Sequence, residues 1–156
     1  EGFRIMKKEH CVKLIKQIEE SNLIFESVNF PHKKHLKTDI NTPIFSWFND
    51  MIKKEVKELN KNYIPTDWIT LLLYKKGDFF NEHTDASSYP GYLSAGYLLN
   101  EDFSGGEFVV EKEKLSSNIG DLFTFGRNDN HYITPVTEGI MYSIHFSILL
   151  DKKSVI

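Results

Sequence analysis

The chain contains 156 residues, of which 40% are hydrophobic and 26% are charged, and its formal net charge is −3. This length predicts one globular domain that can bury a proper core. Because the net charge is slightly negative, the chain has no overall basic surface for nucleic acid, and we expect no nucleic-acid partner. No apolar run approaches the roughly 18 residues of a transmembrane helix, so we expect no membrane span.

A single cysteine, Cys11, excludes an internal disulfide. Because a chain without disulfides suits a reducing compartment, we expect a cytoplasmic location. No signal peptide is visible, and the first residue is Glu1 rather than methionine, which leaves open whether a targeting segment precedes it. Cys11 falls in an apolar helical pattern, so we expect it to be buried.

Residues 1–66 are expected to form a helical support for the rest of the domain. An apolar stripe with a period near 3.6 predicts the first helix. The members of this stripe are Val12, Leu14, Ile15 and Ile18. We expect an extended stretch at 23–28 and a surface loop at 32–35.

The second expected helix begins at Thr42 and Pro43, because threonine is a good N-cap and proline suits the first helical position. Apolar residues then recur at helical spacing and predict the buried face. These residues are Phe45, Phe48, Met51, Ile52, Val56 and Leu59.

From residue 67 onward the pattern changes to short strands separated by turn signals rich in Gly and Pro. The expected strands are 68–75, 79–84, 92–99, 107–111, 121–125, 132–136 and 140–150. Helices followed by about seven strands predict a β-sandwich or barrel, formed by residues 67–150 and covered by helices on one face.

The last expected strand has two different faces, since side chains alternate along a strand. One face carries Tyr142, Ile144, Phe146 and Ile148. The other carries Met141, Ser143, His145 and Ser147. We expect the apolar face to pack under the helices and the polar face to line a cavity. His145 should lie in that cavity; the alternative is a core histidine bonded to Ser143 or Ser147.

Two histidines and an aspartate have the spacing of a metal site. His83 and Asp85 share one face of an expected strand, and His131 follows 46 residues after Asp85. Two imidazoles and a carboxylate can occupy one face of an octahedral iron(II) ion, leaving the opposite face for an oxidant and a co-substrate. This spacing also arises by chance, so the surrounding residues decide whether it indicates a metal site.

Four surrounding segments occur in order. They are YKKGDFFNEHTD at 74–85, LLNEDFSGGE at 98–107, GDLFTF at 120–125 and HYITPVTEG at 131–139. They resemble Y-x-x-G-x(5)-H-x-D, YLN-x-x-F-x-GGE, G-D-x-x-x-F and H-x-x-x-P-V-x-x-G. These are the motifs of the prolyl 4-hydroxylase-like branch of the 2-oxoglutarate/iron(II) dioxygenases, and the resemblance covers about residues 68–150.

The resemblance implies a double-stranded β-helix, or jelly roll, with the metal at its open end. The iron ligands would be His83, Asp85 and His131. Tyr74 would donate its hydroxyl to the co-substrate, and Gly105 and Gly106 would serve the hairpin geometry. The implied cofactors are Fe(II), 2-oxoglutarate and O₂. The implied reaction is hydroxylation of a peptidyl or small-molecule substrate, with prolyl hydroxylation as the family default.

The sequence departs from the family where the far carboxylate of 2-oxoglutarate should bind. The family carries Arg or Lys ten residues after the distal histidine, and this chain has Met141 there. The hydroxyl-bearing first residue of the hairpin motif is Leu98, whereas Ser143 is retained. Burying a carboxylate without a partner is costly, so the lost anchors need an explanation.

Three explanations stay open. In the first, another residue supplies the charge, with His145 as the best candidate and Arg127 and Lys75 as others. A protonated His145 would make co-substrate binding weaken as pH rises through its pKa. In the second, the co-substrate is another 2-oxo acid with a shorter or apolar tail. In the third, the protein binds metal without 2-oxoglutarate, as a jelly-roll binding module or an oxidase of another kind.

We expect the substrate to enter over the loops at 85–91 and 126–130, with Arg127 in contact with substrate or co-substrate. A zinc hydrolase fits poorly, because no glutamate at helical spacing is available as a general base.

Overall fold

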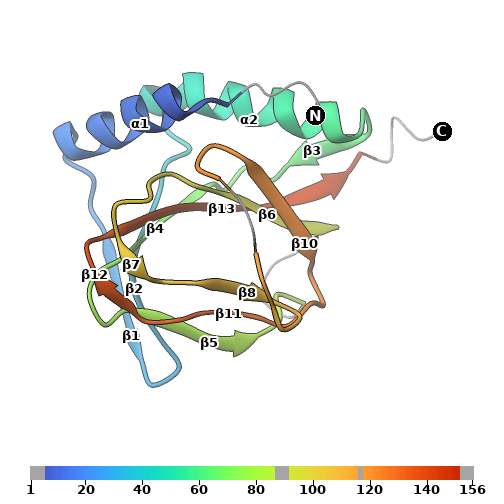
Figure 1. Cartoon of the computed structure of the whole chain (residues 1–156). Coiled ribbons are helices and arrows are strands. Elements are labelled where there is room, and N and C mark those ends of the chain that lie inside the picture. The colour runs from blue at the N-terminus through green and yellow to red at the C-terminus, as the bar shows by residue number, and fades with distance from the viewer. Residues whose placement is uncertain (1–5, 87–91, 116–117, 152–156) are drawn as a thin grey trace.

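A strongly curled antiparallel sheet with two helices across one face forms the fold in the computed structural model (Figure 1). The structure describes residues 6–86, 92–115 and 118–151. The helices are α1 (Lys8–Glu20), the 3-10 helix η1 (Pro43–Phe45) and α2 (Ser46–Leu59). The strands are β1 (Glu26–Phe30), β2 (Lys33–Asp39), β3 (Tyr63–Pro65), β4 (Thr70–Tyr74), β5 (Phe79–His83), β6 (Leu93–Leu98), β7 (Ser104–Gly105), β8 (Phe108–Val110), β9 (Glu113–Lys114), β10 (Leu122–Gly126), β11 (His131–Ile133), β12 (Val136–Glu138) and β13 (Met141–Leu150).

The main sheet has the order β10-β6-β13-β4-β2-β5-β11-β8-β9, with β1 paired to β2 and β3 paired to β13. β12 and β7 form a separate pair. The sheet curls until its ends meet, since the Phe108 ring on β8 lies 5.3 Å from Phe123 and 5.6 Å from Phe125 on β10. The jelly roll expected from the sequence is therefore confirmed.

The helices pack against the outer face of β4, β13 and β6 (Figure 1). α1 buries Cys11, Leu14 and Ile18, as the spacing of three and four residues requires. Val12, however, is 61% exposed, so the expected stripe was wrong at that position. Phe48, Ile52 and Val56 of α2 are fully buried. No helix in the described ranges is long and apolar enough to span a membrane.

β13 separates the core under the helices from the interior of the curl. Ile144, Phe146 and Ile148 belong to the core that the helices cover, as predicted. On the opposite face, His145 and Ser147 line a cavity inside the curl. Because side chains alternate along the strand, β13 contributes both to the core under the helices and to the cavity.

The surface loop predicted at 32–35 is wrong, because residues 33–39 form β2 in the middle of the sheet. β2 pairs with β4 through Leu36↔Leu73 and with β5 through Lys33↔Phe80. The inward face of β2 lines a cavity that also contains charged and imidazole side chains, so its sequence lacks the apolar alternation that marks a strand. The region expected to be helical support therefore also contributes a central strand.

A buried hydrogen bond joins α2 to the sheet. Tyr97 Oη donates to Glu55 Oε1 at 2.5 Å, and both residues are buried. Burial, together with the neighbouring charge of Glu55, raises the pKa of Tyr97 well above its usual value, so the hydroxyl stays protonated and keeps donating.

Tyr97→Phe should lower the free energy of unfolding by about 1–3 kcal/mol, because a buried carboxylate loses this donor. Tyr142→Phe is the matched control, since its hydroxyl donates to exposed Glu19 at 3.4 Å. The control should cost less than about 0.5 kcal/mol. Urea unfolding measures both variants, and equal losses would contradict a stabilising role for the buried bond.

Candidate metal centre and its cavity

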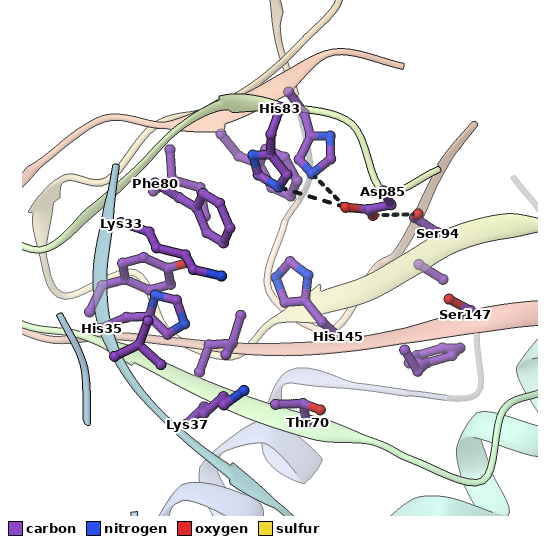
Figure 2. A pocket seen from close by; sticks show the side chains of 18 of the residues that line it. Lys33, His35, Lys37, Thr70, Phe80, His83, Asp85, Ser94, His145 and Ser147 are labelled. Atoms are coloured by element: carbon purple, nitrogen blue, oxygen red, sulfur yellow. Dashed lines mark hydrogen bonds and ion pairs between the residues drawn. The ribbon is translucent and has the colours of Figure 1, made fainter. Parts of the chain in front are cut away.

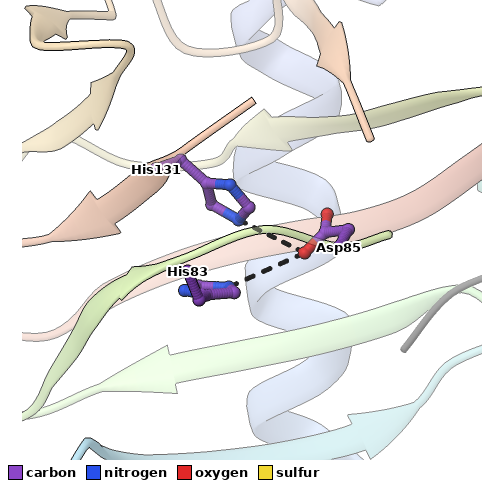
Figure 3. A group of neighbouring side chains, drawn as sticks. All are labelled: His83, Asp85 and His131. Carbon is purple, nitrogen blue, oxygen red and sulfur yellow. Dashed lines mark ion pairs between the residues drawn. The ribbon is translucent and has the colours of Figure 1, made fainter. Parts of the chain in front are cut away.

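The pairing of β5 with β11 brings the three predicted metal ligands together (Figure 3). The register places His131 directly opposite His83. Asp85 Oδ1 lies 3.6 Å from His83 Nε2 and 3.3 Å from His131 Nε2. The backbone N–H of Asp85 donates to the carbonyl of Arg127 at 2.9 Å, which fixes the turn after β5 beside the loop that precedes β11.

Backbone carbonyls determine which nitrogen of each imidazole faces the centre. His83 Nδ1 lies 2.7 Å from the Asn81 carbonyl oxygen, and His131 Nδ1 lies 3.1 Å from that of Asp129. Because a carbonyl oxygen only accepts, each Nδ1 carries the hydrogen and each Nε2 presents a lone pair. Hydrogen bonds of this kind orient metal-binding histidines.

The donor set fits a divalent metal ion. Two Nε2 atoms and a carboxylate oxygen converge on one point, so a cation placed among the three atoms would be bound by all of them. Ligands at right angles, each about 2.1 Å from an ion, lie roughly 3 Å apart. The separations of 3.3 and 3.6 Å from Asp85 Oδ1 are close to that value. Two imidazoles and one carboxylate suit iron(II) and similar ions.

Both His83 and Asp85 have pKa values that favour metal binding. Burial is the largest cause that lowers the pKa of His83, so its imidazole is neutral near pH 7. Burial acts to raise the pKa of Asp85, but the interactions with His131 and Ser94 outweigh it and hold the pKa below its usual value. The site therefore offers a neutral imidazole on His83 and an ionised carboxylate on Asp85.

Ser94 on β6 supports the carboxylate. Its Oγ donates to Asp85 Oδ2 at 2.6 Å, which leaves Oδ1 facing the two histidines. The sequence motifs gave no sign of this partner, because Ser94 lies on a different strand from all three ligands.

Ser94→Ala should weaken metal affinity roughly 10- to 100-fold, because Asp85 loses the bond that orients it. Ser147→Ala is the control, since its buried side chain lines the same cavity from β13. Calorimetric titration with Ni(II) or Co(II) measures both affinities. Unchanged affinity in Ser94→Ala would contradict the orienting role.

The metal centre borders a cavity of about 340 Å³ inside the curl (Figure 2). Several of its lining residues are polar or charged, although the walls also include apolar and aromatic side chains. The charged and imidazole-bearing residues of the lining are Lys33, His35, Lys37, His83, Asp85, His131 and His145. A cavity of this size beside a metal centre accommodates a small molecule.

The residues predicted to bind the co-substrate lie in two places. Tyr74 and His145 line the cavity. Met141 is 3% exposed and packs in an apolar cluster with Tyr74, and Leu98 packs against the same cluster. Ser143 is buried and bonded to His145, with 2.9 Å between Ser143 Oγ and His145 Nε2. The position of the family's basic residue is thus filled by apolar packing.

None of the three predicted substitutes brings a positive charge into the cavity. Burial is the main cause that lowers the pKa of His145 to about 4, so its imidazole is neutral near pH 7, which contradicts the expected role. Arg127 donates to the carbonyl of Ala86 and is not part of the cavity lining. Lys75 is exposed in the turn after β4.

Two cationic side chains that do line the cavity, Lys33 and Lys37, were not predicted from the sequence. The available signal was their spacing with His35, because residues at i, i+2 and i+4 share one face of a strand. The mouth predicted at 85–91 and 126–130 is only partly described, since residues 87–91 lie outside the described ranges.

Two buried histidines should make the fold sensitive to acid. Burial is the main cause that lowers the pKa values of His35 and His145 to about 4, whereas an unfolded histidine titrates near 6.5. Between these pH values the unfolded chain binds more protons at the two histidines, so their contribution to the free energy of unfolding falls as pH falls from about 6.5 to 4 and then levels off.

His35→Phe keeps the ring packing against Tyr74 and Phe80 but removes one of the two buried titratable imidazoles. Between pH 7 and 4.5 this variant should lose about 1–2 kcal/mol less stability than the unchanged protein. Urea unfolding at a series of pH values measures the difference, and parallel curves would show that His35 does not contribute.

Comparison with known proteins establishes the fold through structure rather than sequence. No protein-family model and no curated protein sequence matches the chain. A 2OG-Fe(II) oxygenase family oxidoreductase from Burkholderia pseudomallei is 17% identical with a TM-score of 0.72, covering 90% of this chain and 79% of its own. The viral collagen prolyl hydroxylase of Paramecium Bursaria Chlorella virus-1, in a 2OG complex, is 20% identical with a TM-score of 0.68, covering 92% and 91%. A Trichoplax adhaerens prolyl hydroxylase, in complex with a peptide fragment, is 13% identical with a TM-score of 0.69, covering 95% and 80%.

Proposed function

We propose that the protein is an iron(II)- and 2-oxoglutarate-dependent dioxygenase that hydroxylates a peptidyl or small-molecule substrate. The observation that carries the proposal is the centre of His83, Asp85 and His131 beside a cavity of about 340 Å³. The similar structures support it, because one belongs to the 2OG-Fe(II) oxygenase family and another is a 2OG complex.

The proposed roles follow from the positions of the side chains. His83 and His131 would bind iron through Nε2, and Asp85 through Oδ1. When bound, iron(II) with 2-oxoglutarate and O₂ supplies the oxidising power for C–H hydroxylation, while the protein orients and shields. Ser94 and the two carbonyls hold the ligands in position.

Aromatic rings restrict the access of water to the centre. The Phe80 ring stacks on His83 at 3.9 Å between ring centroids, and the Phe125 ring lies 4.6 Å from that of His131. Excluding water from a site of oxidative chemistry protects reactive species from side reactions. These rings would leave the cavity as the approach for the co-substrate.

A peptidyl substrate is supported by the T. adhaerens structure, which holds a peptide fragment. A small-molecule substrate is equally compatible with the cavity. Arg127 would act on the substrate side indirectly, because it ties the turn after Asp85 to its own loop through the carbonyl of Ala86.

The second candidate function is a metal-binding jelly roll that uses another 2-oxo acid or has no catalytic activity. The apolar packing around Met141 favours it, since this position offers nothing to a carboxylate. The two candidates differ in whether 2-oxoglutarate binds the metal-loaded protein and is consumed.

Anaerobic titration of the iron(II)-loaded protein with 2-oxoglutarate should give a saturable metal-to-ligand charge-transfer absorbance, and admission of O₂ should convert the acid to succinate. Asp85→Ala should abolish both signals, because the centre loses the carboxylate that Asp85 supplies. Asp39→Ala, at an exposed position of β2, is the control. Bound iron without any absorbance or turnover would contradict the dioxygenase function and favour a binding role.

A further inference from the structure

The inward face of β2 carries the cationic side chains of the cavity. Lys33, His35 and Lys37 alternate along the strand and all three line the cavity, whereas Lys34 is exposed on the opposite face. Asp85 is the single acidic residue of that lining within the described ranges, and its Oδ1 faces the metal centre. The part of the cavity away from the metal is therefore positively charged and suits an anion.

Ring contacts connect Lys33 to His83 through Phe80. The Nζ atom of Lys33 is 5.1 Å from the centroid of the Phe80 ring, and that ring stacks on His83. Figure 2 shows the ammonium group of Lys33 directed into the cavity, on the side of Phe80. The aliphatic stem of a lysine packs on apolar surface while its charge stays available.

The two lysines differ in their partners. Lys37 Nζ forms an ion pair with Glu26 at 3.6 Å. No ion pair between Lys33 and a carboxylate occurs within residues 6–86, 92–115 and 118–151. Lys33 is half-buried in the cavity wall, where a charge is more costly to leave without a counter-ion than on the open surface. An anionic ligand would provide that counter-ion.

His35 gives a second sign of a polar ligand. It is 4% exposed, lies between the two lysines on the strand, and its Nδ1 has no hydrogen-bond partner among the described residues. Buried polar atoms are nearly always paired, so an orphaned one in a cavity wall indicates a missing ligand or water.

The topology explains how a positive charge on β2 can replace one on β13. β4 lies between these two strands, and Tyr74 on β4 pairs with Met141 on one side. On the other side the Tyr74 ring lies 5.2 Å from that of His35. A cation carried by β2 therefore reaches the same cavity from the opposite flank of Tyr74.

We propose that Lys33 binds the far carboxylate of the 2-oxo acid, in place of the basic residue that the chain lacks at Met141. This inference rests on the proposed function and specifies its co-substrate: a dicarboxylic 2-oxo acid rather than one with an apolar tail. A charge-assisted hydrogen bond from the ammonium group to the carboxylate gives the selectivity.

The test compares two acids of five carbons, 2-oxoglutarate and 2-oxovalerate, which differ only in the terminal carboxylate. Their dissociation constants are measured anaerobically by charge-transfer absorbance with iron(II), and by calorimetry with the Ni(II)-loaded protein. Lys33→Met should raise the constant for 2-oxoglutarate roughly 10- to 100-fold and that for 2-oxovalerate less than about 3-fold. Lys33→Arg should restore most of the affinity, because it restores the charge.

Lys34→Met is the matched control from the outer face of β2, and it should leave both constants unchanged. If Lys33→Met and the unchanged protein bind 2-oxoglutarate equally well, the inference is overturned while the proposed function stands. The same conclusion follows if only Lys37→Met loses affinity for 2-oxoglutarate. A parallel loss for both acids would show that Lys33 only supports the structure. Bound metal without binding of either acid to the unchanged protein would overturn the proposed function together with the inference.

Discussion

The antiparallel register of β5 and β11 is the constraint on which the candidate site depends. It sets His83 opposite His131 across 48 residues of sequence, and a slip of one residue would turn an imidazole away from the centre. The turn after β5 is then fixed to the loop before β11 by the bond between Asp85 N–H and the Arg127 carbonyl. The three candidate metal ligands are therefore held by backbone pairing, with Ser94 and two backbone carbonyls as further support.

Around this centre, the alternation of side chains along each strand decides which residues face the core and which face the cavity. β13 directs Ile144 and its neighbours to the core under the helices and His145 to the cavity. β2 directs Lys33 and Lys37 to the same cavity and pairs with β4 and β5 through its backbone. The result is a cavity with a metal-binding end and a cationic wall, which matches the two ends of a dicarboxylic 2-oxo acid. On one side of Tyr74, Met141 supplies no positive charge, whereas on the other side β2 supplies Lys33.

The convergence of His83, Asp85 and His131 and the strands of residues 67–150 could be predicted because their motifs join chemistry to a fixed spacing. The fold class followed from turn signals and from the two faces of the last strand. β2 could not be predicted in the same way, because its inward side chains are Lys33, His35 and Lys37, which line the cavity and do not give the apolar alternation of a strand. His145 was correctly expected in the cavity, but its charge state depends on burial that only the folded structure reveals. Ser94 depends on pairing between distant strands.

The most direct test of this account is a crystal structure of the protein loaded with Ni(II) and 2-oxoglutarate. We expect the ion to be bound by His83, Asp85 and His131, with the far carboxylate of the acid within hydrogen-bond distance of Lys33 Nζ. An ion held by other residues would contradict the proposed centre. An acid whose far carboxylate lies toward Ser143, or away from β2, would contradict the assignment of the cationic wall.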